Sequence, residues 1–107
     1  MHLEKQSDRS LMEKPLQLVD PTLYEKLKQS LAHYHLHEFD VAARASVEQD
    51  GILLHLRYGE NLSYLKEKRF KWETVKADNA QISDFFLAAC EDIKQALISD
   101  YFKMMKA

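Results

Sequence analysis

Three histidines at alternate positions are the most evident candidates for metal chemistry in this sequence. They are His33, His35 and His37, and imidazole is a ligand for zinc, copper and nickel. If a helix continues to His37, then His33 and His37 lie one turn apart on one face. If the segment is extended, all three side chains share a face. The alternative is structural, because histidines near the end of a helix interact favourably with its dipole. We expect no cofactor and keep metal binding as the less favoured hypothesis.

A second candidate is a pair of arginines on the polar face of a predicted β-hairpin. The predicted register sets Arg44 directly opposite Arg57, and His55 lies beside them opposite Ser46. Like charges that face each other across two strands are unfavourable unless an anion neutralises them, and arginine forks suit carboxylate and phosphate. We therefore predict an anion-binding face at Arg44, Arg57 and His55. The alternative is an open polar face with local ion pairs to Asp40, Glu48 or Glu73.

A third candidate is the basic stretch of residues 66–76, which reads KEKRFKWETVK and carries five positive and two negative charges. Basic residues interleaved with aromatic rings can hold phosphates and stack bases, so Lys68, Arg69 and Lys71 are the nucleic-acid-binding candidates. However, Phe70 and Trp72 share one parity, which is typical of a strand with its rings in the core. The chain as a whole is acidic, with a net charge of −2. Nucleic-acid binding is therefore the disfavoured alternative.

The last helix supplies the candidates for protein binding. Its predicted core stripe needs only part of its apolar residues, and the surplus residues fall about 100° or more away or crowd its far end. A surplus of exposed apolar side chains usually indicates a partner, and an isologous dimer is the simplest use of such a patch. The alternative cover is the N-terminal segment around Leu11, Met12, Leu16 and Leu18. The predicted contact residues are Leu87, Ile98, Tyr101, Phe102 and Met105.

The scarcity of glycine and cysteine excludes several classes of site. Gly51 and Gly59 are the only glycines and cannot supply a dinucleotide-binding or phosphate-binding glycine loop. Cys90 is the only cysteine, so the sequence offers neither an intrachain disulfide nor a multi-cysteine zinc cluster. No histidine or arginine stands one helical turn from Cys90 to activate its thiol. We therefore expect a non-enzymatic binding domain.

Charge and hydropathy indicate the compartment. The longest strictly apolar run covers only residues 85–90, far short of the roughly 20 residues needed to span a bilayer. The first fourteen residues are polar, carry both charge signs and lack the pattern of a signal peptide. With its unpaired cysteine, the sequence predicts a cytoplasmic protein without a membrane partner.

The first helix and the hairpin have clear local signals. Residues 1–14 have little periodicity and are interpreted as a flexible arm. Asp20 and Pro21 then form an N-cap and a first helical residue, and the helix is expected to end between Tyr34 and His37. From Phe39 the period changes to two, and Asp50-Gly51 is typical of a two-residue hairpin turn. That turn pairs Val47 with Leu54, Ala45 with Leu56 and Ala43 with Tyr58.

The remaining elements complete a two-layer fold. A third strand is predicted from Arg69 to Lys76, and residues 62–68 are left open as a short strand or a loop. Asp78 is the predicted cap of a last helix that runs to about Lys106. Residues 15–107 thus form one α+β domain, with an antiparallel sheet of three to four strands, two helices on one face and the order α-β-β-β-α. The predicted function is an adaptor or regulatory domain that forms a homodimer or binds a protein partner.

Overall fold

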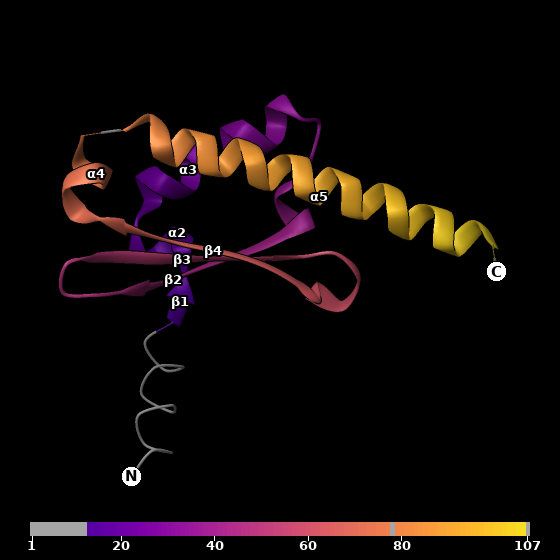
Figure 1. Ribbon diagram of the computed structural model, residues 1–107, viewed down its shortest axis with the longest axis horizontal. Coiled ribbons are helices and arrows are strands. Elements are labelled where there is room, and N and C mark those ends of the chain that lie inside the picture. Colours follow the sequence, from indigo (N-terminus) through magenta and orange to yellow (C-terminus); the bar gives the residue numbers. More distant parts are fainter. Residues whose placement is uncertain (1–12, 78, 107) are drawn as a thin grey trace, which may run out of the picture.

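The structure, a computed structural model, describes residues 13–77 and 79–106. Within these ranges a four-stranded antiparallel sheet, in the order β1-β2-β3-β4, carries helices on one face (Figure 1). The predicted α+β class is confirmed. The strands are β1 (Glu13–Pro15), β2 (Val41–Val47), β3 (Gly51–Tyr58) and β4 (Tyr64–Lys71). The helices are α2 (Leu16–Val19), α3 (Pro21–His33), α4 (Trp72–Lys76) and α5 (Ala80–Lys106), with short 3-10 helices η1 (Glu38–Asp40) and η2 (Glu60–Leu62).

The N-terminal boundary differs from the prediction. Glu13 and Lys14, assigned to a flexible arm, belong to strand β1 and pair with Ser46 and Ala45 of β2. Residues 1–12 of that arm lie outside the described residues. The sheet therefore begins before the first helix, and the element order is corrected to a strand, helices, three strands and helices.

Helix α3 begins as its sequence predicts and ends without a glycine. The Asp20 carboxylate accepts a hydrogen bond from the backbone N–H of Leu23 at 3.1 Å, and Pro21 is the first helical residue. At the other end His35 adopts a φ of 59°, and the N–H of Leu36 bonds to the carbonyl of Leu31 at 2.8 Å. This 6→1 bond around a left-handed residue is the Schellman arrangement, here with histidine in the position that glycine usually occupies.

The β2–β3 hairpin has the predicted faces but a register two residues away from the predicted one. Val47 pairs with Ile52, Ala45 with Leu54 and Arg44 with His55. The turn centres on Gln49 and Asp50, because the N–H of Glu48 bonds to the carbonyl of Gly51 at 2.8 Å. A shift of two residues preserves the side-chain parity, so the apolar residues still share one face.

Gly51 is needed for close packing rather than for a turn. Its φ is not positive, unlike that of Gly59 at 79°. A Cβ at Gly51 would instead lie 2.0 Å from the carbonyl oxygen of Phe70. The glycine lets the backbone of β4 approach the start of β3, which explains why the Asp50-Gly51 pair gave a misleading turn signal.

The third predicted strand was misplaced. Strand β4 covers Tyr64–Lys71, so residues 62–68 are mostly strand, and the last five predicted strand residues form helix α4 (Trp72–Lys76) instead. The long helix is confirmed as Ala80–Lys106. Its start is capped by Asn79, whose side-chain oxygen accepts from the N–H of Gln81 at 2.8 Å; the predicted cap Asp78 lies outside the described residues.

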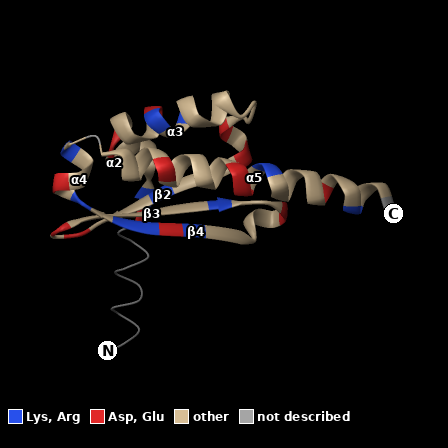
Figure 2. Cartoon of the chain, turned by 45° about the horizontal axis from the view of Figure 1, so that its top comes forward, with Lys and Arg blue, Asp and Glu red and all other residues tan. Residues whose placement is uncertain are grey.

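One apolar core lies between the sheet and the helices. Leu27 and Leu31 from α3 meet Phe86 and Ile93 from α5, and all four side chains are at most 1% exposed. Figure 2 shows α3 and α5 side by side above the sheet, which leaves the opposite sheet face uncovered by any described helix. The core thus accounts for one face of the sheet and for one stripe of α5.

The close approach at Gly51 yields a stability prediction. Gly51→Ala should lower the free energy of unfolding by about 2–3 kcal/mol, because backbone atoms of β4 must move to admit the methyl group. Urea denaturation measures the change, with Gln49→Ala in the same exposed turn as the control, expected within about 0.5 kcal/mol of the parent. Equal stability of the two variants would contradict the packing explanation.

Candidate functional site

The largest set of exposed apolar side chains lies on the C-terminal half of α5. The helix has 27 residues, a length of about 40 Å, and its last turns extend beyond the sheet (Figure 1). All five predicted contact residues are exposed, as is Met104. The exposed fractions are Leu87 38%, Ile98 43%, Tyr101 60%, Phe102 57%, Met104 77% and Met105 65%.

The predicted contact residues on α5 fall on a heptad pattern that sequence reasoning did not identify. Leu87, Ile98, Tyr101 and Met105 join Glu91 and Lys94 at successive spacings of four and three residues. This spacing is that of the a and d positions of a coiled coil. We call these six residues the α5 seam; Phe102 flanks it. Glu91 and Lys94 are exposed, so all six side chains of the seam face solvent. The predicted contact set contains only apolar residues and therefore missed the heptad spacing, which includes these two charged residues.

The N-terminal segment does not cover the seam within the described part of the chain. Leu16 is fully buried in the core, and Leu18, in the same short helix α2, is 74% exposed. Figure 1 places α2 below α3, away from the last turns of α5. Leu11 and Met12, the other residues of the predicted cover, lie outside the described residues.

The two arginines of the predicted anion site share a carboxylate that belongs to this chain. Glu13 Oε1 accepts from Arg44 Nε at 3.1 Å and from Arg57 Nη1 at 2.9 Å, and Arg44 Nη2 also donates to the Glu13 carbonyl at 2.9 Å. Arg44 is the register partner of His55 rather than of Arg57, so the prediction that the two arginines lie directly opposite each other is wrong. The sequence interpretation expected a bound anion, or local pairs to Asp40, Glu48 or Glu73; it placed Glu13 in the arm and so missed this intrachain carboxylate.

The third residue of that predicted site, His55, lies beside the same carboxylate, with its Nε2 4.0 Å from Glu13 Oε2, and belongs to a buried chain of hydrogen bonds. Its Nε2 is 2.9 Å from Ser46 Oγ and its Nδ1 is 2.5 Å from Glu67 Oε2. A serine, a histidine and a carboxylate in this order are also the parts of a nucleophilic triad. Here His55 is only 5% exposed, and Ser46 lies in mid-strand, paired to β1 on one side and β3 on the other. Burial and backbone pairing favour a structural role, because acyl transfer needs substrate access and N–H donors for the oxyanion.

The turn that ends α3 places the three histidines of the predicted cluster in three different backbone environments. His33 is the last helical residue, His35 has a left-handed backbone and His37 caps η1 by accepting from the N–H of Phe39 at 3.3 Å. Among the described residues there is no group of three histidine, cysteine or acidic side chains that could hold a metal ion. His33, His35 and His37 therefore do not form a common ligand set.

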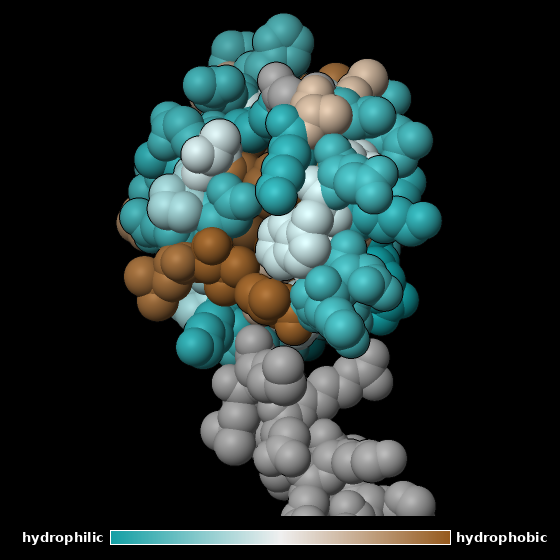
Figure 3. Space-filling view, turned by 90° about the vertical axis from the view of Figure 1, so that its left-hand side faces the viewer, coloured by the Kyte–Doolittle hydropathy of each residue, from teal (hydrophilic) through white to brown (hydrophobic). Residues whose placement is uncertain are grey.

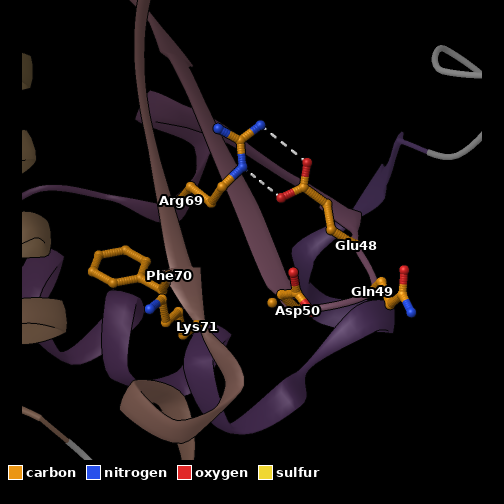
Figure 4. A pocket seen from close by; sticks show the side chains of 7 residues that line it. Glu48, Gln49, Asp50, Arg69, Phe70 and Lys71 are labelled. Carbon is orange, nitrogen blue, oxygen red and sulfur yellow. Dashed lines mark hydrogen bonds and ion pairs between the residues drawn. The ribbon is translucent and has the colours of Figure 1, made fainter.

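The basic strand distributes its charges over both sides of the sheet. Lys68 lies on the helix side, with its ammonium 5.6 Å from the centre of the Phe70 ring, whereas Arg69 lies on the other side and forms two bonds to Glu48 at 2.6 and 3.0 Å (Figure 4). Phe70 is 3% exposed and cannot stack a base. Arg69, Lys71 and the β2–β3 turn also line a hollow of about 400 Å³ at a largely hydrophilic end of the molecule (Figure 3).

Comparisons with known proteins give no identity to these surfaces. The chain matches no protein-family model, no curated protein and no solved structure. Within the described ranges, no helix combines the length and the apolar character that crossing a membrane requires. The α5 seam brings four of the five predicted contact residues into one solvent-exposed row, and the fifth, Phe102, lies beside it.

The Glu13 contacts yield a pH prediction. Burial alone would raise the pKa of Glu13, but the hydrogen bond from Arg57 and the electrostatic interactions with His55, Arg57 and Arg44 outweigh it and lower that pKa. A carboxyl whose pKa is lowered in the folded state stabilises the protein above its unfolded pKa of about 4.3, and this stabilisation is lost as the pH falls through the folded pKa.

Glu13→Gln should therefore cost about 1–2 kcal/mol at pH 7, and the difference from the parent should vanish under acid conditions. Urea unfolding between pH 7 and pH 3 tests this, with Glu25→Gln as the control because Glu25 forms only an exposed i,i+3 pair with Lys28 at 3.5 Å. A difference between parent and Glu13→Gln that grows as the pH falls would contradict the assignment.

The buried cysteine yields a reactivity prediction. Cys90 is fully buried, and burial raises the pKa of its thiol to about 11. Because the thiolate is the reactive form, a thiol reagent at pH 8 should modify Cys90 only after unfolding, with a rate that rises steeply across the urea transition. Rapid modification of the folded protein would show that Cys90 is accessible.

Proposed function

We propose that this protein is a non-enzymatic protein-binding domain that forms a homodimer through the α5 seam. The observation that carries the proposal is the six-residue heptad pattern on an exposed helix whose opposite stripe already fills the core. Coiled-coil partners bury side chains at this spacing, and sustained apolar exposure at it indicates a protein surface. A cytoplasmic location is part of the proposal, since a lone buried thiol suits a reducing compartment.

The order of charges in the seam supports an antiparallel arrangement. A two-fold axis between Asp92 and Ile93 would place Glu91 opposite Lys94 of the second copy, and Lys94 opposite Glu91. The same axis would place Leu87 against Ile98 on both sides of these ion pairs. A parallel arrangement would instead bring Glu91 against Glu91 and Lys94 against Lys94, and such like-charge contacts are unfavourable.

The extension of α5 fits the same arrangement. In the antiparallel dimer the last turns of one copy lie along the first turns of α5 in the other. Met105 then faces the small residue Ala80, and the hydroxyl of Tyr101 faces the carboxylate of Asp84. Phe102 would cover Ser83. The proposal thus gives the extended end of α5, which packs little against its own sheet, a surface of matching polarity and size.

A self-associating domain of this size acts as an adaptor or as a regulatory subunit, because dimerisation presents two copies of every other surface. Nucleic-acid binding receives less support, since Phe70 is buried and Arg69 is already paired with Glu48. Metal binding receives less support because the three histidines diverge.

Charge reversal tests the proposed dimer. Glu91→Lys should place two lysines opposite each other and weaken self-association about tenfold or more, as should Lys94→Glu. The double variant Glu91→Lys/Lys94→Glu should recover most of the affinity because the opposite charges face each other again. Sedimentation equilibrium over a range of concentrations measures the dissociation constant.

Ser99→Lys is the matched control, because Ser99 is exposed on α5 and lies about 100° or more around the helix from the neighbouring seam residues; it should dimerise like the parent. A parent chain that stays monomeric at millimolar concentration would refute the proposal. So would a double variant that is no better than the single ones.

A further inference from the structure

Strand β4 is an open edge of the sheet, and its length sets it apart from the other edge. It has eight residues, whereas β1 at the opposite edge has three within the described part of the chain. It pairs with β3 along its whole length, and no described strand pairs with its other side. Edge strands offer unpaired backbone groups to an added strand, and proteins limit this by making such edges short or charged.

The backbone pattern identifies which residues of β4 offer those groups. Trp72 donates its N–H to the carbonyl of Asp50 at 3.1 Å, and these two residues continue the β3–β4 register. In an antiparallel pair, hydrogen-bonded and non-bonded residue pairs alternate. Phe70, Lys68 and Lys66 therefore bond to β3. The N–H and carbonyl groups that point away from the sheet are those of Leu65, Glu67, Arg69 and Lys71.

The hairpin confirms this alternation independently. The bond from Glu48 to Gly51 at 2.8 Å assigns the odd-numbered residues of β3 to β2. The even-numbered residues of β3 then face β4, and their register partners on β4 are also even-numbered. The Trp72–Asp50 bond and the Glu48–Gly51 bond thus assign the same four residues of β4 to the outward-facing side of the edge.

A groove follows this edge. A cavity of about 370 Å³ lies between β4 and α5 and is lined by Lys66, Glu67 and Lys68 from the strand and by Gln81, Asp84, Phe85 and Ala88 from the helix. An edge strand beside a helix is a geometry in which an extended peptide is held by backbone bonds on one side and by side-chain contacts on the other. The groove therefore gives an added strand a wall as well as an edge.

The charges of the edge select the occupant. Residues 66–71 carry four basic side chains and one acidic side chain, visible as mostly blue segments of β4 in Figure 2. Lys66 is paired with Asp92 at 2.9 Å, Glu67 with His55 and Arg69 with Glu48. Within the described chain, Lys68 and Lys71 have no ion-pair partner. They lie on opposite sides of the sheet, three residues apart.

We propose that the β4 edge binds an extended acidic segment of another protein by strand addition, with acidic residues three apart opposite Lys68 and Lys71. A second copy of this chain is a poor occupant. Antiparallel self-pairing centred on Glu67 would set Glu67 against itself and Lys66 against Lys68, and facing like charges destabilise a strand pair. This surface lies on the side of α5 turned toward β4, so it goes beyond the proposed dimer and does not depend on it.

Amide hydrogen exchange of the full chain, with a synthetic strand as the probe, tests the proposal. The probe is the blocked peptide TEVTEVT, which has two glutamates three apart, and its control is TKVTKVT. In the free protein the amides of Lys66, Lys68 and Phe70 should exchange slowly, and those of Leu65, Glu67 and Arg69 rapidly. Saturation with TEVTEVT should slow the second set about tenfold or more and leave the first set unchanged.

A backbone variant tests the same surface by affinity. Arg69→Pro removes an outward N–H without breaking a bond to β3 and should weaken TEVTEVT binding about tenfold. Its control Arg69→Ala, which loses the same ion pair with Glu48, should weaken binding less than threefold. Isothermal titration calorimetry gives the constants, and the exchange experiment on the unaltered chain needs no variant to fold.

Several results would overturn the proposal. They are equal binding of TEVTEVT and TKVTKVT, equal loss in Arg69→Pro and Arg69→Ala, or protection of the outward amides by raised protein concentration alone, which would make a second copy the occupant. Protection by a thymidine oligonucleotide but not by TEVTEVT would identify the edge as a nucleic-acid surface.

Discussion

The alternation of backbone hydrogen bonds across β3 is the constraint on which the rest of this structure depends. Odd-numbered residues of β3 bond to β2 and even-numbered residues bond to β4, as the contacts of Gly51 and Trp72 establish. The same alternation sends the side chains of Ile52, Leu54 and Leu56 into the core and those of His55 and Arg57 to the other face. One register thus determines the core, the polar network and the free edge of β4.

Helix α5 connects this framework to the proposed function. Covering a sheet face beside α3 requires one apolar stripe, and Phe86, Ala89 and Ile93 supply it. The helix nevertheless continues past the sheet and carries a second pattern at heptad spacing. Its two long sides have different neighbours, since one side forms the groove with β4 and the α5 seam faces solvent. The two surfaces lie on different sides of the helix and meet at Asp84, which lines the groove and continues the heptad spacing of the seam toward the start of α5.

Patterns over a few neighbouring residues correctly predicted the features that are set by interactions between those residues. The cap at Asp20 and Pro21, the length of α5 and the parity of the hairpin faces depend on residues a few positions apart. The predicted hairpin register was wrong by two residues because Gly51 was interpreted as a turn residue. The structure instead requires a glycine there for close contact with Phe70, a residue nineteen positions away in the sequence. Parity alone could not detect the error, since a shift of two leaves every side chain on its face. The described part of strand β1 is too short for any periodicity, so the bond from Arg57 to Glu13 could not be anticipated. Of the two binding surfaces, the sequence predicted the apolar residues of the seam. It could not predict the free edge of β4, because that edge depends on the order of the strands in the sheet.

The most direct test of the central claim, antiparallel dimerisation through the α5 seam, is disulfide mapping between two copies. The paired substitutions Leu87→Cys and Ile98→Cys place two thiols about 16 Å apart within one helix, too far for an intrachain bond. Under mild oxidation, antiparallel pairing predicts a covalent dimer in which peptide mapping finds residue 87 bonded to residue 98 of the other copy. Bonds between like positions, 87 to 87 or 98 to 98, or no covalent dimer at concentrations where the chain associates, would contradict it.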